Sequence, residues 1–126
     1  MPKILVVDDE EKFTKLYSTI LMKEGYEVLT ASGAQKGFDL AVSMQPNLIL
    51  LDIMMPSING AEALETLSED ERTKHIPVIF LTSLIKEGEV DDAQGEIGGR
   101  EYISKSAPNA KFIARVKQAL SDSARV

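Results

Sequence analysis

The stretch KILVVDDE at residues 3–10 runs from an apolar segment straight into three consecutive acids. Its first five residues are too few for a buried helix and are rich in branched aliphatic side chains, which predicts a strand covered on both faces. Strands of that kind belong to the parallel sheets of α/β proteins. Asp8, Asp9 and Glu10 therefore bring three like charges to the carboxyl end of a core strand, and this clustering needs an explanation.

The rest of the chain repeats the alternation of a short apolar strand with an amphipathic helix. Helical spacing of apolar residues extends from about residue 10 to residue 24, and Gly25 is a natural helix stop. Five repeats with short links predict an α/β fold, a five-stranded doubly wound parallel sheet with helices on both faces. The further strands are expected at 26–30, 47–51, 77–81 and 101–103, and the further helices at 34–45, 61–70, 84–97 (with only a weak apolar stripe) and from Pro108 through Leu120.

Length and composition favour one ordinary domain, residues 1–126, with its own hydrophobic core. The chain has no cysteine and no apolar run near the roughly 20 residues of a membrane span, so we expect a cytoplasmic protein without membrane contact. A formal net charge of -6 disfavours direct binding to nucleic acid.

Polar side chains follow four of the five expected strands. In open parallel sheets, ligands bind outside the carboxyl ends of the strands. We therefore expect these side chains to converge on one functional rim: Asp8 and Asp9 after the first strand, Asp52 after the third, Thr82 and Ser83 at the end of the fourth, and Lys105 after the fifth.

The negative charges of the carboxylates at this rim indicate a bound cation. Two carboxylates about 4 Å apart repel by roughly 4 kcal/mol at an effective dielectric constant near 20. Oxygen ligands without histidine or cysteine indicate a hard ion, and Mg²⁺ typically takes one or two protein carboxylates together with waters and substrate phosphate. Asp8, Asp9 and Asp52 suit that arrangement. One carboxylate could then attack phosphorus to form an aspartyl phosphate, with Thr82 and Lys105 contacting the phosphoryl oxygens.

The chain resembles the receiver domain of bacterial two-component response regulators, including stand-alone chemotaxis-type receivers. The resemblance covers essentially the whole chain and implies a sheet of flavodoxin-like order 2-1-3-4-5. It rests on ILVVDDE at 4–10, LILLDIMMPSING at 48–60, PVIFLTS at 77–83 and YISK at 102–105.

The resemblance also implies a role for each residue of the rim. Asp52 would be the phosphoacceptor, and Asp8, Asp9, Asp52 and the backbone carbonyl of Met54 would hold Mg²⁺. Thr82 would be the switch hydroxyl, Lys105 the cation that pairs with the phosphate, and Tyr102 the aromatic whose rotation reports phosphorylation. Met54 and Leu84, each two residues after a site residue, would influence the lifetime of the phosphate.

The implied function is a signalling switch rather than a metabolic enzyme. The phosphoryl group would come from a phosphohistidine on a sensor histidine kinase or a phosphotransfer protein. The receiver would catalyse this transfer itself and slowly hydrolyse its own acyl phosphate. Phosphorylation would then alter binding to a downstream protein, or to a second copy in a homodimer, at the face formed by the helix at 84–97, the strand at 101–103 and the last helix.

Two features depart from the pattern of this family. Ser106 stands after Lys105 where proline, often with a cis bond, is usual. Because a cis bond before a residue other than proline costs roughly 2.5–4 kcal/mol, the approach of Lys105 to the phosphate depends on this bond. The second departure is the acidic, glycine-containing stretch 84–99, which puts the length of the fourth helix and the partner surface in question.

Several residues also have simpler interpretations. Asp8 and Asp9 could cap the first helix, Asp52 could form a turn before Pro56, and Thr82 could merely end a strand. Lys105 by itself would be a surface lysine, and Tyr102 a strand aromatic packed against a helix. His75, the only histidine, is expected in a solvated loop away from the acids.

Two other functions compete with the switch. A metal-dependent phosphatase or phosphotransferase for small molecules could use the same acids, although the short loops after the strands leave little room for a substrate pocket. A receiver-like scaffold that binds a partner without phosphorylation is the third hypothesis. The complete set of acids, hydroxyl and lysine disfavours the scaffold, whereas the missing proline after Lys105 leaves it open.

Overall fold

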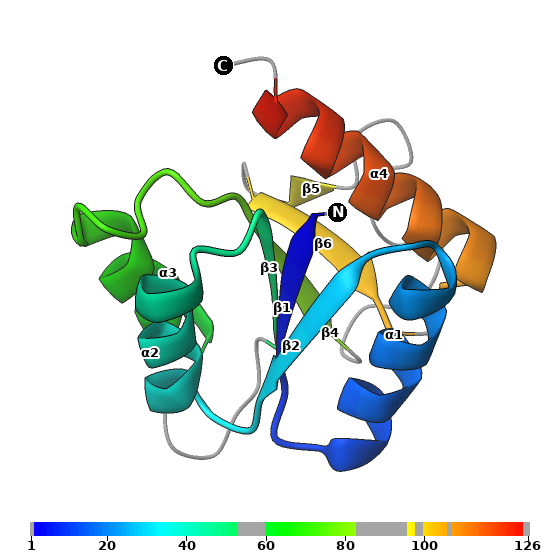
Figure 1. The fold of residues 1–126 in the computed structure, drawn as a ribbon, viewed down its shortest axis with the longest axis horizontal. Coiled ribbons are helices and arrows are strands. Elements are labelled where there is room, and N and C mark those ends of the chain that lie inside the picture. The colour runs from blue at the N-terminus through cyan, green and yellow to red at the C-terminus, as the bar shows by residue number, and fades with distance from the viewer. Residues whose placement is uncertain (1, 53–59, 83–95, 98–99, 106, 125–126) are drawn as a thin grey trace.

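The computed structural model describes residues 2–52, 60–82, 96–97, 100–105 and 107–124. Strands and helices alternate over residues 3–82, and two further strands and a last helix follow in the described part of the chain (Figure 1). The elements are β1 (Lys3–Val7), α1 (Glu11–Lys23), β2 (Glu27–Ala31), α2 (Ala34–Met44), β3 (Leu48–Asp52), α3 (Gly60–Glu69), β4 (Val78–Thr82), β5 (Glu96–Ile97), β6 (Arg100–Ser104) and α4 (Asn109–Ala124).

The sheet has the order β2-β1-β3-β4-β6-β5. Its first five members in this order run parallel to one another, which confirms the prediction of five parallel strands in the order 2-1-3-4-5. The sixth strand, β5, was not predicted. It has two residues and pairs antiparallel with β6 at the edge of the sheet.

Helices cover both faces of the sheet, as predicted. The pairs α1 with α4 and α2 with α3 lie on opposite sides in Figure 1. Alternate residues of the central strands point to the two sides: Ile4, Val6, Leu48 and Leu50 pack with α1 and α4, whereas Leu5, Val7, Ile49 and Leu51 pack with α2 and α3. Residues 4–7 of β1 and 48–51 of β3 are apolar because both faces of these strands are buried.

The end of α1 shows how a local signal sets an element boundary. Gly25 adopts a φ of 91°, in the left-handed region that glycine enters without steric cost. Its amide donates to the carbonyl of Met22, and the amide of Tyr26 donates to that of Leu21. These two bonds close the last turn and redirect the chain into β2.

The prediction of a helix over 84–97 is wrong at its carboxyl end, because Ile97 belongs to β5. In antiparallel register with Arg100, this residue extends the sheet by one short strand. The remainder of that expectation, residues 84–95, lies outside the described residues. Among the helices that the structure describes, none combines the length and the apolar character needed to cross a membrane.

Candidate functional site

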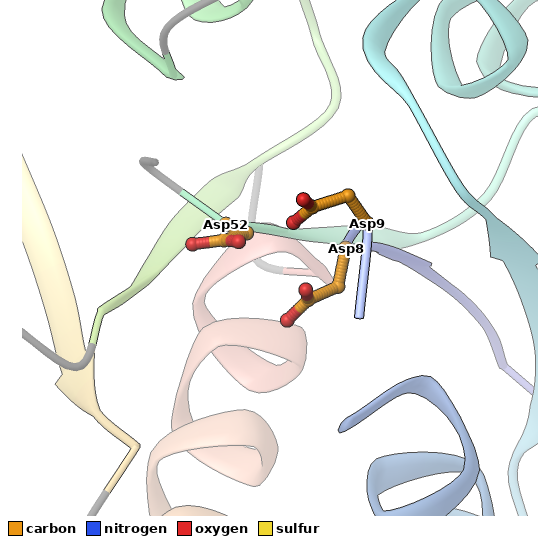
Figure 2. A group of neighbouring side chains, drawn as sticks. All are labelled: Asp8, Asp9 and Asp52. Carbon is orange, nitrogen blue, oxygen red and sulfur yellow. The ribbon is translucent and has the colours of Figure 1, made fainter. Parts of the chain in front are cut away.

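Three acids from two strands gather at the carboxyl edge of the sheet. Asp8 and Asp9 follow β1, and Asp52 ends β3, which lies beside β1. One carboxylate oxygen from each lies within 4.8 Å of the others, and Figure 2 shows the three side chains side by side. Asp8 and Asp52 are buried and Asp9 is exposed, so the cluster is open to solvent on the Asp9 side.

Asp8 divides its two oxygens between a local and a distant partner. Oδ1 accepts a hydrogen bond of 2.9 Å from the backbone amide of Glu10, just before α1 begins. This bond forms a local turn at the entry to α1 and is not a helix cap, because its donor is the N-cap residue itself. Oδ2 faces the ammonium of Lys105, whose Nζ lies 2.7 Å away. Asp8 therefore does not cap the helix as the simpler interpretation expected, and its role in a metal site stays a prediction.

Lys105 is a buried member of the cluster rather than a surface lysine. Its side chain is only 4% exposed, and its Nζ lies 3.5 Å from Asp52 Oδ2 as well as 2.7 Å from Asp8 Oδ2. The backbone positions it: the amide of Lys105 donates to the carbonyl of Thr82 at 2.8 Å, which prolongs the pairing of β4 with β6. The sheet thus brings Thr82 and Lys105 to the same edge as the acids.

The charge of the described cluster leaves room for a divalent cation. Three carboxylates and one ammonium carry a formal charge of -2. The donor set is all oxygen, which is the set that Mg²⁺ prefers. These residues therefore fit Mg²⁺ in charge and in donor type.

Thr82 and Tyr102 lie on the same face of the sheet. Phe80 pairs in register with Tyr102, and Thr82 is two residues beyond Phe80 on β4, so alternation places these side chains together. The Phe80 and Tyr102 rings are 5.2 Å apart with an interplanar angle of 35°. Tyr102 is partly buried and packs against the α2/α3 side of the core, as its simpler interpretation expected.

Two aromatic residues near the acids were expected only as part of the apolar stripe of the first helix. The Phe13 ring centroid lies 4.0 Å from the Nζ of Lys105. Burial, with a further contribution from the negative charges of Asp8 and Asp52, raises the pKa of the Tyr17 hydroxyl to about 12. The sequence does contain a signal for their position near the acids. Phe13 and Tyr17 lie four and eight residues after Asp9, and this spacing places them on one side of the helix that follows Asp9.

An open groove of about 690 Å³ leads to the acids from solvent. It runs between α1 and the segment that joins β2 to α2, and its lining includes Asp8, Asp9, Thr14, Ser18, Ser32 and Lys36. Lys36 and the hydroxyl-bearing residues contribute polar groups to the lining of this groove. Some of the predictions concern residues outside the described part of the chain. They are the predictions for Met54, Ser83, Leu84 and the Lys105–Ser106 bond.

The family model of the response regulator receiver domain matches residues 4–117, which contain the described strands except for Lys3 at the start of β1. The chain belongs to this family. The predicted resemblance is thereby confirmed, and the chain is a receiver domain of two-component signal transduction.

Individual relatives agree with this receiver assignment. The polar-differentiation response regulator DivK of Brucella anthropi is 36% identical over 124 residues, covering 97% of this chain and 99% of its own length. The DNA-binding dual master transcriptional regulator RpaA of Synechocystis sp. is 39% identical over 128 residues, but the chain spans only 52% of that protein. A receiver domain of a signal transduction histidine kinase from Syntrophus aciditrophicus superposes with a TM-score of 0.82 at 26% identity, covering 100% of this chain and 95% of that one.

Proposed function

We propose that this receiver is a phosphorylation-activated switch that accepts a phosphoryl group on Asp52. The observation that carries the proposal is the position of this carboxylate. It is 3% exposed, it lies 3.5 Å from the Lys105 ammonium, and its oxygen is within 4.8 Å of oxygens from two further acids. A carboxylate in such surroundings can act as a nucleophile toward phosphorus once the repulsion of its neighbours is compensated.

Mg²⁺ is the cation we propose for this compensation. Asp8, Asp9 and Asp52 would hold it, with the backbone carbonyl of Met54 as a further ligand. When bound, the ion supplies positive charge that neutralises the acids and the incoming phosphoryl oxygens. The exposure of Asp9 and the groove beside it give the ion and the phosphoryl donor a route to the site.

The chain's own residues would carry out the transfer. An Asp52 oxygen forms a bond to phosphorus while the bond between phosphorus and a histidine nitrogen of the donor breaks, and that nitrogen keeps the electron pair. The Lys105 ammonium pairs with the phosphoryl oxygens as a point charge, and the Thr82 hydroxyl donates a hydrogen bond to one of them. Water later cleaves the acyl phosphate, which returns the Asp52 carboxylate and releases inorganic phosphate.

The donor in this proposal is a sensor histidine kinase or a histidine phosphotransfer protein. The output is a change in binding to a downstream protein or to a second copy of the chain. Thr82 and Tyr102 share one face of the sheet, so a displacement of Thr82 toward the phosphoryl group would free space for the Tyr102 ring. A local charge change would in this way bias a two-state element next to β6 and α4.

The test of this function is the intact mass of the protein after incubation with acetyl phosphate, with and without Mg²⁺. We expect one phosphoryl group on the wild type in the presence of Mg²⁺ and none on Asp52→Ala. Asp39→Ala is the matched control, because Asp39 is an exposed acid on α2 that bonds to Gln35. Phosphorylation of Asp52→Ala, or its loss in Asp39→Ala, would contradict the assignment of Asp52.

Beryllofluoride binding is the second test, for the case in which the acyl phosphate on Asp52 hydrolyses before its mass can be measured. Beryllofluoride forms a stable mimic of the acyl phosphate on a competent receiver, so binding to the wild type but not to Asp52→Ala supports the proposal. Absence of both the adduct and the complex in the wild type would overturn it and favour a scaffold that acts without phosphorylation.

A further inference from the structure

The Phe13 ring is a contact of Lys105 that phosphoryl transfer does not require. Phe13 lies in the first turn of α1, and its ring centroid is 4.0 Å from the Lys105 Nζ. This distance is within the range of a cation–π interaction, which is stronger when the cation is shielded from water. The Lys105 side chain meets that condition, since only 4% of it is exposed.

Neighbouring aromatic residues hold the ring in its place. The Phe13 ring stacks on Tyr17 with centroids 6.1 Å apart and an interplanar angle of 18°. Tyr17 in turn contacts Phe112 of α4 at 4.7 Å. Because this row joins α1 to α4, the orientation of the Phe13 ring is set by packing as well as by its contact with the lysine.

The position of the ammonium conflicts with the position of a metal. Lys105 Nζ lies 2.7 Å from Asp8 Oδ2 and 3.5 Å from Asp52 Oδ2. Both carboxylates belong to the cluster that fits Mg²⁺. An ammonium so close to Asp8 and Asp52 repels a divalent cation that enters the site. A contact that stabilises the ammonium in this position therefore weakens metal binding.

We propose that Phe13 is a positioning residue that holds the Lys105 ammonium on Asp8 and Asp52 while no metal is bound, and thereby weakens the affinity for Mg²⁺. The metal part of this inference rests on the proposed function. The ring acts through Lys105 alone and touches neither the phosphoryl group nor the ion. Its removal therefore affects the position of the lysine first and metal affinity as a consequence.

The position of the lysine is tested without metal, by nuclear magnetic resonance of protein labelled at the lysine ε-carbons. Protons near the face of an aromatic ring resonate upfield, so the Lys105 Hε signals should stand apart from those of the other lysines. Lys105→Met identifies them by their disappearance. We expect Phe13→Leu to move them toward the common lysine position and Phe13→Tyr, which keeps the ring, to leave them upfield.

Lys12 requires its own control, because its Nζ is 5.2 Å from the same ring centroid. The Lys12 side chain is largely exposed. Lys12→Met should therefore leave the Lys105 signals unchanged. The positioning role would be overturned if the chemical shift of the Lys105 Hε signals did not change in Phe13→Leu. It would also be overturned if that chemical shift changed in Lys12→Met instead.

Metal affinity is tested by calorimetric Mg²⁺ titration of the same variants. Loss of a cation–π contact of ordinary strength should make Phe13→Leu bind Mg²⁺ about two- to fivefold more tightly than the wild type. Phe13→Tyr should bind as the wild type does. In the Lys105→Met background, Phe13→Leu should have no effect, because the group through which the ring acts is gone.

The outcomes separate this inference from the proposed function. An unchanged or weakened affinity of Phe13→Leu, or an equal effect in both backgrounds, would overturn the antagonism between Phe13 and the metal. A wild type that binds no Mg²⁺ would contradict the metal site of the proposed function and the antagonism together, while the metal-free spectra would still decide where Phe13 holds Lys105.

Discussion

The Nζ of Lys105 lies 2.7 Å from Oδ2 of Asp8, and both side chains are almost completely buried. The two residues come from opposite ends of the chain, and the parallel arrangement of β1, β3, β4 and β6 brings them to one edge of the sheet. Without metal, the ammonium is the charge that compensates the Asp8 carboxylate among the described residues. The stability of the metal-free protein should therefore depend on this pair.

Lys105→Met should destabilise the metal-free protein by about 3–5 kcal/mol, because removal of one partner leaves a buried carboxylate uncompensated. Urea unfolding in the presence of a chelator measures this change. Saturating Mg²⁺ should restore part of the loss, since the ion compensates Asp8 in place of the ammonium.

Lys117→Met is the matched control for Lys105→Met. Lys117 lies 3.1 Å from Glu24, but both side chains are substantially exposed. An ion pair of this kind contributes about 0–1 kcal/mol. Equal losses in the two variants, or a loss in Lys105→Met that Mg²⁺ does not reduce, would contradict the role assigned to the buried pair.

Asp9→Asn should change stability and metal affinity in opposite directions. Asp9 is the exposed acid of the cluster, so removing its charge relieves repulsion and should stabilise the metal-free protein by up to about 1 kcal/mol. The same change removes a ligand and should weaken Mg²⁺ binding by about tenfold or more. Chelator-treated urea unfolding and calorimetric titration measure the two effects.

Asp39→Asn is the control for the Asp9 variant, because it removes an exposed charge from α2. We expect it to leave Mg²⁺ affinity unchanged. If Asp9→Asn lowered the stability of the metal-free protein, repulsion among the three carboxylates would not be the main effect of the Asp9 charge on folding.

The raised pKa of Tyr17 predicts a loss of stability at alkaline pH. The unfolded chain releases the phenol proton near pH 10.0, whereas the folded protein holds it up to about pH 12. The contribution to stability is therefore complete below pH 10 and is lost as pH rises through 12. Two pKa units correspond to about 2–3 kcal/mol.

Tyr17→Phe should remove this dependence, because phenylalanine has no proton to release. Urea unfolding between about pH 9 and pH 12 compares the wild type with the variant, and the difference between the two curves isolates the effect of the Tyr17 phenol. Tyr26→Phe, at a partly buried tyrosine just after α1, is the control and should retain the wild-type slope. Parallel curves for wild type and Tyr17→Phe would show that the phenol is not responsible.

Gly37 marks a close approach of α2 to β1. A Cβ atom at this position would lie 2.8 Å from Cγ2 and 3.2 Å from Cγ1 of Val7. Gly37→Ala should therefore destabilise the protein by about 1–3 kcal/mol through overpacking, although alanine is the better helix former by about 1 kcal/mol.

A double-mutant cycle with Val7→Ala tests this explanation by unfolding free energy. In the Val7→Ala background the two close contacts are gone and only the Cβ of residue 7 remains, at an ordinary contact distance of 3.6 Å, so Gly37→Ala should be neutral or stabilising by up to about 1 kcal/mol. The same destabilisation in both backgrounds would mean that the close contact is not its cause.

Much of the fold could be predicted because its signals are local. The fully apolar runs of β1 and β3 indicate strands with two buried faces, and Gly25 has the left-handed conformation that a helix stop requires. Strand β5 escaped prediction because two residues are too few for a periodic pattern. It is recognised by its antiparallel backbone pairing with β6.

The candidate site was predictable as a set of residues but not as a set of contacts. The position of each strand end in the sequence already placed Asp8, Asp9, Asp52, Thr82 and Lys105 at one edge, because parallel strands share the direction of their carboxyl ends. Which oxygen of Asp8 faces the helix entry, and which faces Lys105, depends on side-chain directions that no sequence pattern specifies.

The sequence by itself determined the α/β alternation, the order of the residues that meet at the rim, and the family. The alternation and the order follow from periodicity and from spacing along one chain, whereas the family follows from the resemblance of four motifs to those of receiver domains. Only the tertiary structure decided that the Phe13 ring lies against the Lys105 ammonium and that Tyr17 carries a raised pKa. Both facts depend on how α1 packs beside α4 on one face of the sheet, next to the end of β6, and this packing sets distances and desolvation between groups far apart in the sequence.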